Sequence, residues 1–115
     1  MTASVIDAAT FAELQESAGA DFVAELVDTF LEETPALLTE LRSARHAADA
    51  DRFRRAAHSI KSNSQTFGAL GLGALARELE LQGLHADASA DGRAIDTLQT
   101  AYATAAAALK GLRDV

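Results

Sequence analysis

Residues 51–67 read DRFRRAAHSIKSNSQTF, and their apolar side chains recur at the spacing of an α-helix. At about 100° per residue, one sector of roughly 100° collects Phe53, Ala56, Ala57, Ile60, Ser64 and Phe67. We therefore predict an amphipathic helix that buries this sector. Asp49 or Asp51 is expected to cap its start, and Gly68 is expected to end it.

The residues before this stretch predict two more helices. Residues 1–9 are expected to form a loosely ordered lead-in. Thr10 and Glu13 form a capping-box pattern, so a short helix is expected to start at Thr10 and to end at Gly19. Asp21 can cap a second, longer helix. Pro35 interrupts the apolar face of that helix, which predicts a kink or a break.

The residues after Gly68 predict two further helices. A turn over residues 68–73 opens the first, Gly83 should end it, and a polar loop should follow over residues 85–92. The last helix should bury one stripe of side chains, composed of Ile95, Leu98, Tyr102, Ala105, Leu109 and Leu112. The predicted fold is all-α: an antiparallel four-helix bundle with a short additional N-terminal helix, forming a single domain over residues 1–115.

Composition restricts the possible functions. A chain of 115 residues, 49% hydrophobic and 23% charged, suits one globular domain. The longest apolar run is too short to cross a bilayer, and no signal peptide is visible. The absence of cysteine excludes disulfides and thiolate metal sites and fits a cytoplasmic protein. A net charge of −7 argues against nonspecific binding to nucleic acid or to an anionic membrane.

The main functional signal is His58, which lies roughly 150° from the centre of the buried sector and should face solvent. Its helical neighbours are Arg54, Arg55, Lys61, Ser62 and Gln65. A neutral imidazole nitrogen is nucleophilic near neutral pH and can attack an activated phosphorus. Neighbouring cations offset the charge of about −2 that a phosphoryl group brings. A solvated histidine among ordinary surface cations would show the same pattern, so the wheel alone leaves both interpretations open.

The wider stretch over residues 57–69, AHSIKSNSQTFGA, resembles the signature of bacterial histidine-containing phosphotransfer (HPt) domains. The matching positions are His58, Ile60, Lys61 and Gly68, followed by Leu72, Leu75, Leu79 and Glu80. Many family members carry glycine four residues after the histidine, where this chain has Ser62. That departure puts in doubt how closely a partner's backbone approaches the histidine.

The resemblance implies a carrier in a two-component phosphorelay. A receiver domain with Mg²⁺ at its own aspartyl-phosphate site, or a hybrid sensor histidine kinase, would hand a phosphoryl group to His58. Another receiver aspartate would then take it. Lys61 and Gln65 would assist the transfer, and the partner would supply the catalytic machinery, so neither a cofactor nor an enzymatic activity is expected of this chain. The residues expected to contact the phosphoryl group or the partner are Arg54, Arg55, Ser62, Phe11 and Leu14. We expect a cytoplasmic monomer.

Two alternatives remain open. One is the phosphorylatable domain of a chemotaxis-type histidine kinase, although the initial methionine and the lack of a following kinase domain favour a stand-alone carrier. The other is an adaptor bundle that docks receivers without accepting phosphate, although the presence of both His58 and Lys61 argues against that. We expect no metal site, because His46, His58 and His85 lie in separate segments without suitably spaced acidic residues.

Overall fold

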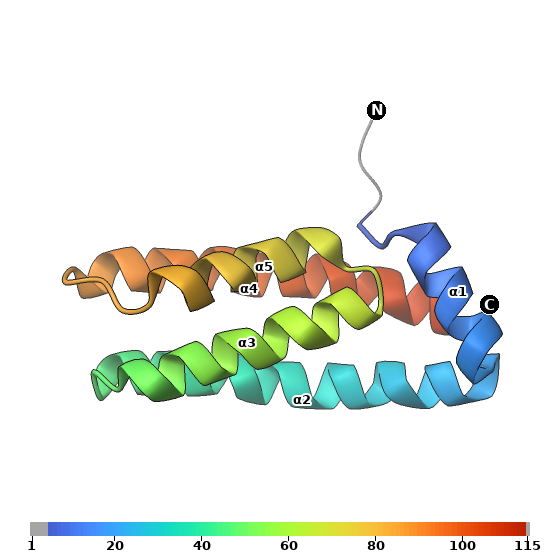
Figure 1. Ribbon diagram of the computed structural model, residues 1–115, viewed down its shortest axis with the longest axis horizontal. Helices are drawn as coiled ribbons and strands as arrows, with labels where there is room; N and C mark the ends of the chain where they lie inside the picture. The colour runs from blue at the N-terminus through green and yellow to red at the C-terminus, as the bar shows by residue number, and fades with distance from the viewer. Residues whose placement is uncertain (1–4, 115) are drawn as a thin grey trace.

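The structure is a computed structural model that describes residues 5–114. Its helices are α1 (Ala8–Ala18), α2 (Ala20–His46), α3 (Ala50–Thr66), α4 (Leu70–Gln82) and α5 (Ala88–Arg113). Helices α2 to α5 lie side by side as a bundle, and α1 packs at one end of it (Figure 1). Within residues 5–114 there is no strand, which confirms the predicted all-α fold class. None of the described helices is long and apolar enough to cross a membrane.

The predicted buried faces of α3 and α5 are largely confirmed. Every residue of the sector predicted for α3 is buried. The stripe on α5 is buried at Ile95, Leu98, Ala105 and Leu109. The prediction was wrong for Leu112, whose exposed fraction is 38%, because it lies at the rim of a hollow between α5 and α1. Tyr102 is only half-buried.

The first helix begins earlier than predicted. Asp7, and not Thr10, is its N-cap: the Asp7 carboxylate accepts hydrogen bonds from the Thr10 backbone nitrogen at 3.0 Å and from Thr10 Oγ1 at 2.6 Å. The Thr10 hydroxyl therefore donates a hydrogen bond to the Asp7 carboxylate and does not cap the helix. The preceding Ile6 is buried in the core, so the expected loose lead-in is wrong over these residues. The start of α2 also differs, since it begins at Ala20 and Asp21 lies within its first turn.

Helix α2 continues through Pro35, where a kink or a break was expected. Proline has no backbone N–H, so the carbonyl of Leu31, four residues earlier, loses its usual donor. The Tyr102 hydroxyl on α5 donates a hydrogen bond to this carbonyl at 3.2 Å. A side chain from a neighbouring helix therefore supplies the missing donor, which explains why the helix is not interrupted here.

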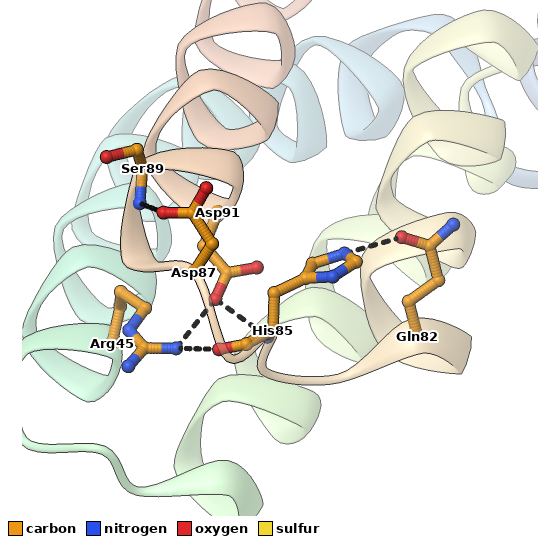
Figure 2. Close-up of polar contacts among 6 residues, drawn as sticks. All are labelled: Arg45, Gln82, His85, Asp87, Ser89 and Asp91. Atoms are coloured by element: carbon orange, nitrogen blue, oxygen red, sulfur yellow. Dashed lines mark hydrogen bonds and ion pairs between the residues drawn. The ribbon is translucent and has the colours of Figure 1, made fainter.

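The connection between α4 and α5 is shorter than predicted, because α5 begins at Ala88 with Asp87 as its N-cap. Asp91 consequently lies in the first turns of α5, where its side chain is fully buried. Its Oδ2 accepts hydrogen bonds from Arg45 Nη1 at 2.8 Å and from the His85 backbone nitrogen at 3.0 Å (Figure 2). Arg45 Nη1 also donates to the His85 carbonyl at 2.8 Å. These bonds attach the connection to the end of α2.

Candidate functional site

His58 lies on the outer surface of α3, as the helical wheel predicted, and 56% of its side chain is exposed. The ring is not free on both sides. Its Nδ1 atom lies 2.7 Å from Oε2 of Glu80, a residue of α4 that is 22 positions away in the sequence. One nitrogen is therefore held by a carboxylate, whereas no contact of Nε2 is found among the described residues.

Glu80 also binds Lys61. The Lys61 ammonium lies 2.8 Å from Oε1 of Glu80, so the two carboxylate oxygens contact two different side chains of α3. Both Glu80 and Lys61 are mostly buried, with side-chain exposures of 18% and 20%. The close packing of α3 and α4 makes this possible: a Cβ at Gly73 would lie only 3.2 Å from Gln65 Cγ. The glycine thus lets α4 approach the histidine helix.

The protonation of Glu80 determines the tautomer of His58. Hydrogen bonding from Lys61 lowers the pKa of the Glu80 carboxyl most; burial opposes this shift, and the hydrogen bond with His58 lowers the pKa further. Glu80 is therefore ionised at neutral pH and can only accept hydrogen bonds. The proton of the short contact must then lie on Nδ1 of His58. In the neutral ring this leaves a lone pair on Nε2, the nitrogen that faces away from Glu80.

The arginines around His58 are already paired. Arg54 Nη2 lies 2.6 Å from one Asp51 oxygen and Arg55 Nη2 lies 3.1 Å from the other. All three side chains are more than half exposed, so these pairs contribute little to stability and can exchange for another anion. Cations are present one turn from His58, as predicted, but Asp51 balances part of their charge.

A shallow hollow lies beside the histidine, between α2 and α3. It is lined by Glu33, Ala36 and Leu37 of α2 and by His58, Ser59, Ser62 and Asn63 of α3. Ser62 therefore occupies the wall of this hollow, one turn from the ring. Its side chain is small, and the residue is exposed. A partner that entered the hollow would reach the imidazole from the α2 side.

Comparison with known proteins identifies the family of the chain. No curated protein sequence matches the chain. The family model of the Hpt domain matches residues 25–108. The chain belongs to the Hpt domain family. It is also similar to the crystal structure of histidine-containing phosphotransfer protein B (HptB) from Pseudomonas aeruginosa PAO1, with 29% sequence identity and a TM-score of 0.85. That match covers 98% of this chain and 97% of the other.

Membership of the Hpt family establishes histidine phosphotransfer in a phosphorelay as the general function of the chain.

Phe11 and Leu14 were expected to contact a partner. Both belong to α1, which lies at the end of this Hpt domain opposite to the connection between α2 and α3 (Figure 1). Phe11 is only 4% exposed and belongs to the core, so it offers almost no surface to a partner. Leu14 is half-buried against the same core. The structure does not bring either residue into the hollow beside His58.

The other histidines of the Hpt domain lie elsewhere. His46 ends α2, and His85 lies in the connection between α4 and α5, where its Nε2 atom is 3.2 Å from Gln82 Oε1. Among residues 5–114, no three histidine or acidic side chains are grouped so that they could hold a metal ion. His58 is the histidine that combines an exposed ring with neighbouring cations and a carboxylate partner.

Sequence reasoning missed two partners of the site. Asp51 was considered only as a helix cap, although its place three and four residues before the arginines is the spacing of helical ion pairs. Glu80 was noted only as the acidic residue that ends the matched motif. Its contact with His58 depends on how two helices pack, and no local spacing indicates it.

Proposed function

We propose that this Hpt domain is a phosphoryl carrier in which His58 accepts the phosphoryl group from the aspartyl phosphate of a receiver domain. That receiver is either a separate protein or part of a hybrid sensor kinase. A second receiver aspartate then takes the group from His58. The observation that carries the proposal is the asymmetric environment of the ring: Nδ1 bonds to Glu80 at 2.7 Å, and Nε2 lies on the open side. Family membership supports the same general activity.

The transfer balances without a cofactor on this chain. The Nε2 lone pair attacks the phosphorus, an N–P bond forms, the O–P bond of the aspartyl phosphate breaks, and the aspartate leaves as a carboxylate. The Nδ1 proton stays in its hydrogen bond to Glu80 throughout. In the onward step an acceptor carboxylate attacks the phosphorus, and the N–P electron pair returns to Nε2. Because Nδ1 remains protonated, the phosphorylated ring is a cation, which makes the imidazole a good leaving group.

The cations around His58 can compensate the negative charge of the incoming phosphoryl group. Lys61 lies one turn from His58 and is bound to Glu80, from which its ammonium can turn partly toward the phosphoryl oxygens. Arg54 and Arg55 can exchange Asp51 for the same anion, since these exposed pairs are weak. Gln65 and Ser62 are exposed and can donate hydrogen bonds to the phosphoryl group or to the partner.

The receiver supplies what this chain does not. A receiver domain with Mg²⁺ at its own aspartate would neutralise charge at the transferring phosphoryl group. The hollow between α2 and α3 gives that receiver a place to contact beside the ring. We therefore assign a carrier role to the Hpt domain and the catalytic machinery to its partner.

The test is transfer from radiolabelled phosphoreceivers in the presence of Mg²⁺. The label on the small chain should be acid-labile and base-stable, and it should vanish in His58→Gln. The matched controls are His46→Gln and His85→Gln, which remove the two other histidines and should keep the label. Label on His58→Gln would refute the assignment.

Two other results would replace the proposal with one of its alternatives. Label obtained only from a chemotaxis-type kinase with ATP would identify a phosphorylatable kinase domain. Receiver binding without label from either source would identify an adaptor.

A further inference from the structure

The hollow beside His58 continues along the bundle. A second hollow lies between the same two helices and shares Glu33 and Asn63 with the first. The further lining residues of the second hollow are Leu26, Thr29, Phe30, Thr66 and Phe67. Together the two hollows form a groove, which we call the α2–α3 groove. Along α2 it extends from Leu26 to Leu37, which is about 16 Å at the rise of an α-helix.

The two walls of the α2–α3 groove differ in charge. The wall from α3 is formed by small or uncharged side chains next to His58, namely Ser59, Ser62, Asn63, Thr66 and Phe67. The wall from α2 is apolar except for Thr29 and Glu33. Glu33 therefore places the one carboxylate in the lining of the groove, and it lines both hollows.

No cation of the described chain neutralises Glu33. Residues 1–41 contain nine acidic residues and no lysine, arginine or histidine. Two of these acids have partners from other helices, since Asp28 pairs with Arg113 and Glu40 pairs with Arg52. Within residues 5–114, Glu33 takes part in no ion pair, and its side chain is exposed. The groove thus has apolar surface on α2, a wall of uncharged side chains beside His58, and one unmatched negative charge.

We propose that the α2–α3 groove selects receivers that place a lysine or arginine opposite Glu33 when they dock over His58. The inference rests on the proposed carrier function and names the feature that its partners share. A helix suits the groove, because three turns span about 16 Å, so that apolar positions three turns apart can contact Leu26 and Leu37. A cation between those positions would meet Glu33, whereas an acidic side chain there would face a like charge.

The charge should affect partner choice more than chemistry at the ring. Charge complementarity across an interface mainly changes association rates and excludes wrong partners, and the effect of exposed charges weakens with salt. No hydrogen bond or ion pair joins Glu33 to His58, Lys61 or Glu80 in the described structure, so a donor that does not dock can separate the effect of Glu33 on docking from the chemistry of the ring. This separation makes the proposal testable.

The experiment compares Glu33→Lys with Glu32→Lys. Both substitutions change the net charge equally, and both positions are exposed on α2, but Glu32 lines neither hollow. Each variant is first phosphorylated with phosphoramidate, a small donor that needs no docking surface. The phosphorylated proteins are then mixed with a panel of receiver domains from the same genome, and kcat/KM for transfer is measured at low and high salt.

Phosphoramidate labelling gives each variant a reference rate that does not depend on docking, and its transfer to receivers is compared with that rate. Glu33→Lys should lower kcat/KM about tenfold for the preferred receiver at low salt, and Glu32→Lys should change it less than about twofold. Replacing the receiver's facing cation by glutamate should restore transfer to Glu33→Lys. Equal effects of the two variants, or no effect of either, would overturn the role of Glu33. If phosphoramidate and receivers both leave wild-type His58 unlabelled, the proposed function itself fails.

Discussion

Gly68 should be the glycine at which an added methyl group does most damage. Its φ is +81°, a left-handed conformation that costs an L-residue about 1–2 kcal/mol. A Cβ there would also lie 2.9 Å from the Asp7 carbonyl oxygen and 3.0 Å from Thr10 Cβ. The Asp7 backbone nitrogen donates a hydrogen bond to the Gly68 carbonyl at 2.8 Å, so the two segments cannot separate without losing that bond.

The expected cost of Gly68→Ala follows from these two effects. Crowding of this kind in a packed region typically costs about 1–3 kcal/mol. With the conformational cost, the free energy of unfolding should fall by about 2–5 kcal/mol. In a domain of this size that lowers Tm by roughly 8–20 °C. Thermal unfolding followed by circular dichroism at 222 nm measures the shift directly.

Two further variants separate the causes. Gly68→Asn tolerates a positive φ better than alanine but introduces the same Cβ, so it should be about as destabilising if the contact with Asp7 dominates. Gly111→Ala is the matched control: the glycine lies within α5, and no described atom would approach the new Cβ within 4 Å. It should stabilise the protein by about 0.5–1 kcal/mol. A Gly68→Ala variant within about 2 °C of wild type would refute the reasoning, and recovery by asparagine would refute the role of the close contact.

Two other predictions concern charged groups. Arg45→Ala should lower the free energy of unfolding in urea by about 3–5 kcal/mol, because it leaves the fully buried Asp91 carboxylate without its charged partner. Arg42→Ala should lower it by less than about 1 kcal/mol, because the pair with Asp96 is exposed. Equal costs would contradict the stabilising role of the Arg45–Asp91 pair. Glu80→Gln should shift the His58 tautomer away from Nδ1–H, seen in ¹⁵N chemical shifts of the ring, because the amide can donate to Nδ1 where the carboxylate only accepts. Since the pKa of Glu80 is lowered by folding, its contribution to stability is complete above the unfolded carboxyl pKa and is lost as pH falls through the lower folded value. The stability difference between wild type and Glu80→Gln should therefore be largest near pH 6–7 and shrink below about pH 4; a difference that grows in acid would contradict the sign.

The fold could be predicted from local patterns because its signals are local. The buried sector of α3 follows from spacing within one or two turns and is confirmed. Of the two predicted cap residues, Asp49 and Asp51, the structure shows that Asp49 caps the helix. The sequence left open whether α2 is kinked or broken at Pro35, and it could not exclude the break, since the donor that supports the continuous helix belongs to Tyr102, 71 residues from Leu31. The burial of Asp91 could not be predicted for the same reason, because Arg45 reaches it from another helix.

The candidate site was predictable to a similar extent. The wheel of α3 correctly placed His58 on the surface with Lys61 one turn away. It could not show that Lys61 bonds to a carboxylate of α4, nor that the same carboxylate holds the ring. A helical wheel describes one helix, whereas the contacts of this ring depend on the register between two.

Two helices that pack against α3 contribute different features to the site. On one side, α4 brings Glu80 to Nδ1 and to Lys61, and this contact determines which nitrogen carries the proton. On the other side, α2 forms the wall of the groove and contributes the unmatched charge of Glu33. A carrier that must exchange phosphate with more than one partner benefits from this separation, because changes on α2 can alter partner choice without altering the basicity or tautomer of the ring. Substitutions on α4 that face the site should then change the rate of phosphoryl transfer from every donor, including phosphoramidate. Substitutions on α2 that face the groove should change the rate only for donors and acceptors that dock there.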